Sequence, residues 1–192
     1  KGKLISSYHK QIIDDLAEMH RNNYFHLDFK LENTLVDQRG VVKVIDFGLT
    51  KERMRDTVTG GTLGYLAPEV FKNINAGRDM DLRKVDSFAL GIALASSYLG
   101  RYPFRIDLRE PIMHHQREGQ FQTEINRIKS QNLSFGQLIE RLLVFDPNRR
   151  LSPEEIFNTD YYKNTLAKEA SEGQPELGRL IQTIKSRKNT LY

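Results

Sequence analysis

The pattern of apolar positions along the chain predicts mainly helices. Residues from about 6 to 22 place apolar side chains on one face at helical spacing, with Ser6 and Ser7 as capping residues and Asn22-Asn23 as the break. The apolar stripe consists of Ile12, Ile13, Leu16 and Met19. Residues 83–98 are apolar nearly all round, which is typical of a helix buried at the centre of a domain.

Two short β-prone runs interrupt this helical pattern. Residues 35–36 and 41–45 flank a turn that ends in Gly40, so they predict a small hairpin. A short helix is expected to open at Pro68-Glu69, and others are expected over 109–118, 134–145, 152–158 and 176–188, with Ser152 as the cap of the 152–158 helix. The fold class predicted is mainly α with small β-hairpins.

Composition narrows the class of protein. The chain has 192 residues, enough for one domain, and 39% of them are hydrophobic, which argues against disorder. No apolar run approaches the roughly 18–20 residues that span a bilayer, so no membrane segment is expected. The absence of cysteine excludes disulfides and thiolate metal sites and is compatible with a cytoplasmic protein. The net charge of +4 comes from scattered, mixed charges, so nucleic-acid binding is not expected.

Several ionisable residues need an explanation. Asp86 lies within the apolar run 83–98, and a buried carboxylate needs hydrogen-bond partners. His114 and His115 are adjacent, so on a helix they point about 100° apart and do not chelate a metal together. For these two and for His9 and His20, a surface or packing role is favoured over a metal site.

Residues 26–33 carry the strongest candidate chemistry. In an extended segment, Asp28 and Lys30 point to the same side, where a carboxylate can accept a hydroxyl proton and an ammonium can neutralise a moving phosphoryl group. Asn33 and Asp46 offer two oxygen ligands to Mg²⁺, and Gly48 gives the backbone freedom to turn. Each residue alone fits a cap, a turn or a solvated charge, but their joint spacing favours phosphoryl transfer.

These motifs resemble those of eukaryotic-type serine/threonine protein kinases. His26 to Asn33 resembles the catalytic loop, and Asp46-Phe47-Gly48 resembles the metal-binding triplet. Residues 61–69 resemble the end of the activation segment, residues 86–91 the start of the central helix, and residues 146–150 a late Arg-containing motif. The resemblance implies a kinase C-terminal lobe over residues 1–162, followed by a helical extension over 163–192.

The resemblance also implies roles for individual residues. Asp28 would be the catalytic base, Lys30 would contact the transferred phosphate, and Thr62 would bridge the two. The residues implied in binding ATP are Lys30, Glu32, Asn33, Leu35 and Asp46, with Leu35 as the floor under adenine. Asn33 and Asp46 would hold Mg²⁺. His26, Phe47 and Gly48 would give structural support, Asp86 would hold the catalytic-loop backbone, and Glu69 would form a buried ion pair with Arg150.

The chain departs from the kinase pattern at several positions. Leu27 stands where regulated kinases usually carry the Arg that receives an activation-segment phosphate. Activity is therefore expected to depend little on phosphorylation of Thr57 or Thr59. Leu31 replaces the usual Pro, which should matter little. Ser96 stands where arginine-directed kinases carry an acid, so a preference for basic substrates is not supported, although Glu32 offers one contact.

The glycine-rich phosphate loop and the strand lysine of a kinase N-terminal lobe do not occur in this sequence. The leading hypothesis is a kinase that needs that lobe, ATP, Mg²⁺ and a protein substrate. One alternative is a pseudokinase or docking lobe that only binds proteins, which would commonly lack one of the four reactive residues. Another is a small-molecule phosphotransferase, a class without the Ala67-Pro68-Glu69 segment.

Overall fold

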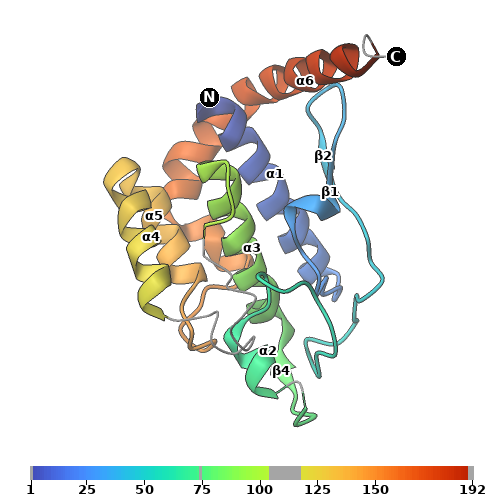
Figure 1. Ribbon diagram of the computed structural model, residues 1–192, viewed down its shortest axis with the longest axis vertical. Helices are drawn as coiled ribbons and strands as arrows, with labels where there is room; N and C mark the ends of the chain where they lie inside the picture. Colours follow the sequence, from blue (N-terminus) through green and yellow to red (C-terminus); the bar gives the residue numbers. More distant parts are fainter. Residues whose placement is uncertain (1, 74, 104–117, 190–192) are drawn as a thin grey trace.

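The computed structural model describes residues 2–73, 75–103 and 118–189 (Figure 1). The helices are α1 (Gly2–Arg21), α2 (Pro68–Asn73), α3 (Leu82–Leu99), α4 (Glu118–Gln131), α5 (Leu133–Leu142) and α6 (Ala167–Asn189). Shorter helical turns are the 3-10 helices η1 (Leu31–Asn33) and η3 (Glu154–Asn158) and the π-helix η4 (Tyr161–Leu166). The strands are β1 (Thr34–Val36), β2 (Val42–Val44), β3 (Arg55–Asp56) and β4 (Met80–Asp81). The fold is mainly helical with small sheets, as predicted.

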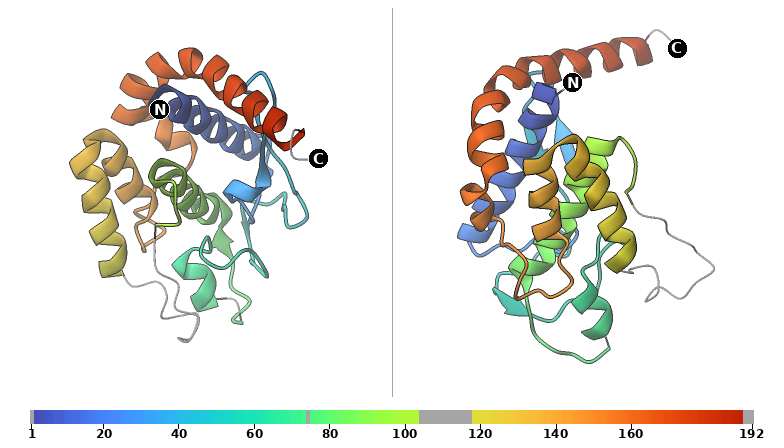
Figure 2. Two further views of the ribbon diagram at one scale, coloured as in Figure 1. Left: turned by 45° about the horizontal axis from the view of Figure 1, so that its top comes forward. Right: turned by 90° about the vertical axis from the view of Figure 1, so that its left-hand side faces the viewer.

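The helix α3 runs through the middle of the molecule (Figures 1 and 2). Asp81 caps its start by accepting a hydrogen bond from the Arg83 N–H, and Gly100 ends it in the left-handed conformation. Its residues from 85 to 96 are buried, and α1 and α5 pack against it. The prediction of a central buried helix over 83–98 is confirmed.

The helix α1 begins at Gly2, earlier than predicted, and the assignment of Ser6 and Ser7 as caps was wrong. Both serines lie inside the helix and are buried. The Ser6 hydroxyl donates to the Glu169 carboxylate at 2.8 Å, so this serine joins α1 to α6. A serine can therefore satisfy a tertiary contact where its local sequence favours a cap.

The strands β1 and β2 form the predicted hairpin. They are antiparallel, with Thr34 opposite Val44 and Val36 opposite Val42. The turn closes through a hydrogen bond from the Gly40 N–H to the Asp37 carbonyl at 3.0 Å, and Gly40 has a φ of 77°, which favours glycine. The hairpin tip reaches α6 (Figure 1), where the Gln182 side chain donates to the Gln38 carbonyl.

The predictions for the later helices were partly correct. The helix over 134–145 is confirmed as α5, but 152–158 folds as the short 3-10 helix η3, and Ser152 lies outside it, donating its N–H to the Glu155 carboxylate. Most of the helix expected over 109–118 lies outside the described residues. The helix α4 was missed, although Phe121, Ile125 and Ile128 form a buried stripe at helical spacing.

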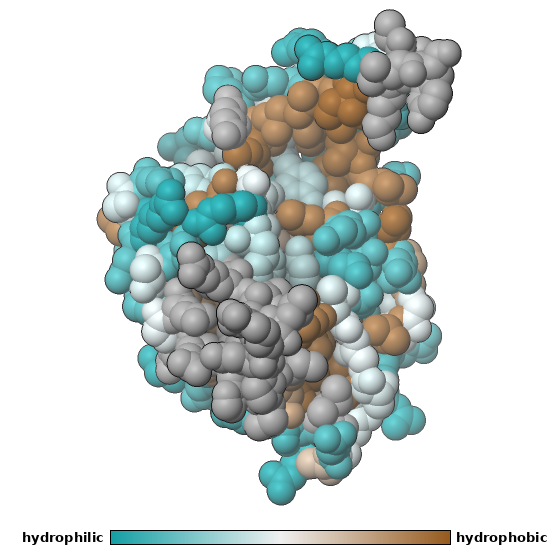
Figure 3. All heavy atoms as spheres, viewed as in Figure 1, coloured by the Kyte–Doolittle hydropathy of each residue, from teal (hydrophilic) through white to brown (hydrophobic). Residues whose placement is uncertain are grey.

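The last helix, α6, starts at Ala167 rather than at about residue 176, and it continues through Pro175. It lies along α1 (Figure 2). At Gly173 the two backbones approach so closely that a Cβ would overlap the carbonyl of Lys3. Hydrophobic side chains gather on one face of α6 (Figure 3), and Leu180 and Ile184 on that helix stay partly exposed. Across the described part of the chain, no helix has the length and hydrophobicity needed to cross a membrane.

Substituting Ala for Gly173 is expected to lower the free energy of unfolding by about 1–3 kcal/mol, because the added methyl overpacks the contact with α1. This loss would oppose helix propensity, which favours Ala over Gly by about 1 kcal/mol. Urea denaturation followed by circular dichroism measures the change. The control is Gly119→Ala in α4, where nothing lies within 4 Å of the new methyl, and it should be neutral or stabilising. Equal effects of the two substitutions would contradict close packing at Gly173.

Candidate active site

The loop of residues 26–33 is hydrogen bonded to a buried carboxylate of α3. Asp86 is fully buried, and its two oxygens accept hydrogen bonds from the backbone N–H groups of His26 and Leu27, both at 2.8 Å. Asp86 also lies 2.7 Å from the ring Nε2 of His20. These partners satisfy the buried Asp86 carboxylate within its apolar helix, and they anchor the loop to the centre of the fold.

The imidazole of His26 connects this loop to the end of the hairpin. Its Nε2 lies 2.9 Å from the Ile45 carbonyl, which can only accept, so Nε2 carries the proton. The Nδ1 atom is then free to accept the Asp28 N–H, at 3.2 Å. The ring is buried and contacts the Phe29 and Phe47 rings. One buried ring therefore positions both the chain at Asp28 and the residue that precedes Asp46.

Asp28, Lys30 and Thr62 form one hydrogen-bonded group. The Thr62 hydroxyl donates to the Asp28 carboxylate at 2.5 Å and accepts from the Lys30 ammonium at 2.8 Å. The ammonium lies 3.9 Å from the other Asp28 oxygen. Both charged side chains keep part of their surface exposed. The predicted bridge by Thr62 is confirmed, and the group presents a carboxylate and an ammonium to the same space.

Asn33 and Asp46 come from neighbouring segments. The Asn33 side-chain amide donates to the Asp28 carbonyl at 2.8 Å, and the Asn33 carbonyl accepts the Ile45 N–H at 2.9 Å. Asp46 follows directly and is exposed. An amide oxygen and a carboxylate are hard oxygen donors of the kind that Mg²⁺ takes, with phosphates and water filling its other positions. The residues therefore fit the ion. No group of three or more His, Cys, Asp or Glu suited to a metal occurs among the described residues.

The backbone conformation of the turn at Asp46-Phe47-Gly48 differs from the prediction. Gly48 was expected to supply the conformational freedom, but the positive φ, 62°, belongs to Asp46. Aspartate tolerates this conformation better than most residues. Gly48 instead places its N–H 3.4 Å from the Asp46 carboxylate. The strained residue is thus the candidate metal ligand itself.

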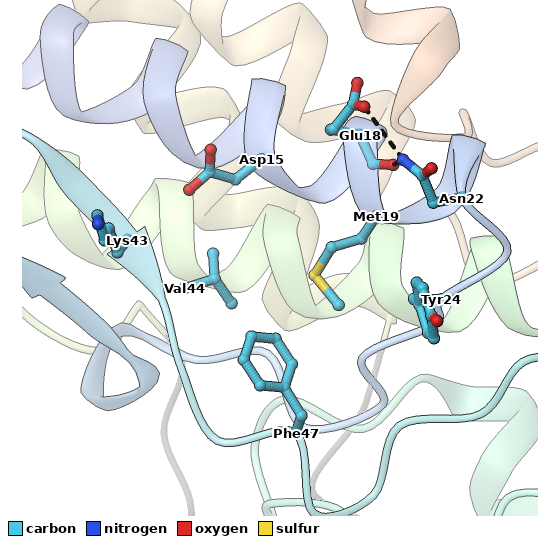
Figure 4. A pocket seen from close by; sticks show the side chains of 8 residues that line it. All are labelled: Asp15, Glu18, Met19, Asn22, Tyr24, Lys43, Val44 and Phe47. Atoms are coloured by element: carbon cyan, nitrogen blue, oxygen red, sulfur yellow. Dashed lines mark hydrogen bonds between the residues drawn. The ribbon is translucent and has the colours of Figure 1, made fainter.

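Phe47 lines an open pocket of about 460 Å³ beside the site. Figure 4 shows its ring facing Met19 and Val44, with Asp15 and Lys43 on one side and Tyr24 on the other. Glu18 and Asn22, which are hydrogen bonded to each other, complete the rim. More than half of the Phe47 side chain is exposed. The pocket thus has an apolar floor and a charged rim.

The remaining residues implied in ATP binding are Glu32, near the end of the 26–33 loop, and Leu35, on the strand that follows it. Leu35 on β1 is exposed, opposite Lys43 on β2. Glu32 in η1 is exposed and lies near Tyr65. The pKa of Tyr65 is raised to about 12, mainly because its hydroxyl is buried and also because the Glu32 carboxylate is close. Glu32 therefore lies close to the segment that contains Thr62 and Tyr65.

Comparison with known proteins agrees with this geometry. Residues 1–162 match the family model described as the protein kinase domain. The chain belongs to the protein kinase domain family. It is 35% identical over 163 residues to CBL-interacting protein kinase 25 of Oryza sativa subsp. japonica. This match covers 81% of the present chain and 30% of that relative.

Two further relatives are also protein kinases. The chain is 31% identical to the ovarian-specific serine/threonine-protein kinase Lok of Drosophila melanogaster and 32% identical to the Aurora kinase of Dictyostelium discoideum, each match covering 82% of this chain. These matches cover 34% and 39% of the relatives. The kinase domain residues present here thus span about a third of the length of these curated relatives.

A buried ion pair joins two distant motifs of the kinase domain. Two guanidinium nitrogens of Arg150 donate to the two carboxylate oxygens of Glu69 at 2.6 and 2.9 Å. Arg150 is 1% exposed, and it also donates to the carbonyls of Val144 and Lys84. The predicted pair is confirmed. It connects the start of α2 to the turn before η3.

The histidines outside the 26–33 loop have packing roles, as predicted for the two that the structure describes. His9 is fully buried, with its ring nitrogens 2.9 Å from the Tyr161 hydroxyl and 2.8 Å from the Ser97 hydroxyl, and burial lowers its pKa to about 3. His20 was not predicted as a partner of Asp86, and no local signal identifies it. His114 and His115 lie outside the described residues.

Proposed function

We propose that this kinase domain transfers the γ-phosphate of ATP to serine or threonine hydroxyls of protein substrates. The observation that supports this most strongly is the group formed by Asp28, Thr62 and Lys30. The Asp28 carboxylate is held by one hydroxyl, which leaves its other oxygen to orient an incoming alcohol and accept its proton. The Lys30 ammonium, on the same side, would stabilise charge on the transferred phosphoryl group.

Asn33 and Asp46 are the residues proposed to hold Mg²⁺. A bound magnesium ion would neutralise charge on the phosphate oxygens. The protein supplies rigidity, because Asn33 is tied through its amide to Asp28 and through its carbonyl to Ile45. The same two hydrogen bonds keep the proposed metal ligands next to the proposed base. Positioning of this kind is most of what phosphoryl transfer requires of a protein.

The exposed apolar residues beside the site support a larger nucleotide-binding cleft. Leu35 and Phe47 are more than half exposed, and in the sequence they closely follow Asn33 and Asp46, the proposed magnesium ligands. We propose that Leu35 contacts the adenine ring and that a kinase N-terminal lobe covers Phe47 and its pocket. In this proposal residues 1–162 form the C-terminal lobe of a two-lobed enzyme located in the cytoplasm, and residues 163–192 form a helical extension.

Two alternatives from other classes are less well supported. A pseudokinase acting only as a binding module would not need the complete set of Asp28, Lys30, Asn33 and Asp46 that this chain carries. A small-molecule phosphotransferase would not need the segment that ends in Glu69, which is tied into the fold through Arg150. Protein phosphorylation uses all of these features.

The test uses the full-length protein that contains this domain, with labelled ATP, Mg²⁺ and a mixed protein substrate. The wild-type protein should label serine or threonine, and Asp46→Asn should reduce kcat/KM by at least about 100-fold, because one ligand of the phosphate-bound ion is lost. The control is Asp160→Asn, which removes an exposed carboxylate that pairs with Asn164 in η4. Labelling that is unaffected by Asp46→Asn would contradict the metal assignment.

A further inference from the structure

Lys51 links the entry of the 26–33 loop to the segment that follows Gly48. Its backbone pairs with Phe25 in an antiparallel bridge: the Phe25 N–H donates to the Lys51 carbonyl at 2.9 Å, and the Lys51 N–H donates to the Phe25 carbonyl at 3.0 Å. Phe25 is buried and directly precedes His26. The position of Lys51 is therefore determined by the same backbone that positions the proposed active site.

The side chain of Lys51 turns toward the activation segment, residues 46–69. Its ammonium donates to the Thr57 carbonyl at 2.7 Å and lies 3.2 Å from the Asp56 carboxylate. The same carboxylate oxygen accepts the Thr57 N–H at 2.7 Å. The ammonium thus contacts the backbone of Thr57 on one side and a carboxylate that caps that backbone on the other. The three residues form a closed set of polar contacts.

The charge of Asp56 is matched to this position. The Thr57 N–H and then the Lys51 ammonium hold the pKa of Asp56 below its usual value, so the carboxylate is ionised at neutral pH. Asp56 belongs to β3, where it lies opposite Met80 on β4, and β4 leads directly into α3. The contact therefore connects the activation segment to the central helix as well as to the 26–33 loop.

Apolar packing also holds this segment, and Leu27 stands at the position where the kinase pattern usually has the Arg that receives an activation-segment phosphate. Leu27 is 5% exposed and belongs to the hydrophobic core. Val58, the residue after Thr57, is also buried in that core. A Cβ at Gly61 would lie 3.3 Å from the Leu27 carbonyl, so the segment returns to the loop at this point. Apolar packing and the Lys51 contacts together hold the segment in place.

We propose that Lys51 and Asp56 are positioning residues that order the activation segment through a carboxylate of the chain itself, without a phosphate on Thr57 or Thr59. This inference rests on the proposed function for its effect on substrates. The ammonium of Lys51 is already balanced by Asp56, so a phosphate on Thr57 would bring a second anion beside the first. Such like-charge crowding would compete for Lys51 and loosen the segment.

The first test is hydrogen exchange across residues 51–62 of the full-length protein. Lys51→Met and Asp56→Asn should each raise exchange there by about tenfold, because each removes a charge-assisted contact. The double variant should exchange no faster than the single ones, and Lys51→Arg should largely restore protection. Glu52→Gln, an exposed carboxylate in the same segment, should leave exchange unchanged. Exchange of the amides in α3 serves as a control for global unfolding. Unchanged exchange at residues 51–62 in both single variants would overturn the proposal.

The second test separates positioning from chemistry. Lys51→Met should raise KM for the protein substrate about tenfold with little change in KM for MgATP, because only the segment beside the substrate loosens. Thr59→Ala should keep wild-type kinetics. Thr57→Ala also removes a hydroxyl that lies 3.3 Å from the Asp56 carboxylate and 3.5 Å from the Lys51 ammonium, so it should raise KM for the protein substrate less than Lys51→Met does. A loss in Thr57→Ala equal to that in Lys51→Met would overturn the proposal, because the segment would then depend on the Thr57 side chain rather than on the Asp56 carboxylate. If the wild-type protein transfers no phosphate, the proposed function fails, while the exchange data still decide whether Lys51 and Asp56 order the segment.

Discussion

Asp28→Asn is expected to lower kcat/KM for phosphate transfer to protein by about 10²–10⁴-fold, the usual contribution of a positioned general base. The amide keeps the shape of the side chain and can still accept the Thr62 hydroxyl, but it cannot accept the substrate proton. It also removes the negative charge 3.9 Å from the Lys30 ammonium. Incorporation of labelled phosphate by the full-length protein measures the effect, with saturating MgATP and varied protein substrate.

A comparison of stability makes this result specific to catalysis. Asp28 is partly exposed, so the Asn variant should unfold in urea at nearly the wild-type concentration. The Asp160→Asn variant should keep both activity and stability. Equal incorporation by the wild-type protein and Asp28→Asn would refute the assignment of Asp28 as the base. A parallel loss of stability and activity would attribute the defect to folding.

Glu69→Ala is expected to lower the free energy of unfolding by about 3–5 kcal/mol, because it leaves the Arg150 guanidinium buried without its counter-charge. Arg150 is 1% exposed and lies 5.0 Å from the centre of the Phe88 ring, so water cannot readily replace the carboxylate. Removing one partner of this pair should therefore destabilise the fold, even if the intact pair contributes little net free energy of folding. Urea denaturation of wild-type and variant protein measures the difference.

The double variant Glu69→Leu with Arg150→Met tests the origin of that cost. Removing both charges should restore much of the lost stability, since a stranded charge is no longer present. Recovery should be incomplete, because the carbonyls of Val144 and Lys84 lose their donor. As a control, Glu140→Ala breaks a partly exposed pair with Lys129 and should cost at most about 1 kcal/mol. A Glu69→Ala effect as small as that of Glu140→Ala would show that the buried charge finds another partner.

The sequence by itself determined the parts of this protein that depend on local pattern and residue chemistry. Apolar periodicity located α3 and α5, and turn residues located the hairpin that ends at Gly40. The spacing of Asp28, Asn33 and Asp46 led to the prediction that this site carries out phosphoryl transfer. The position of Asp86 within an apolar helix indicated that its carboxylate must have hydrogen-bond partners. Each of these signals lies within one short stretch of the chain, the longest being the stretch from Asp28 to Asp46.

Apart from the contacts that the kinase resemblance implied, such as Glu69 with Arg150, only the tertiary structure decided which distant residues meet. Ser6 bonds to Glu169 of α6, and the full extent of α6 follows from its packing on α1 at Gly173 rather than from its own sequence. Lys51 has no local feature that distinguishes it from other lysines, yet a backbone bridge places its ammonium on Asp56. Contacts of this kind depend on backbone approach between segments far apart in the chain, and no periodicity records that approach.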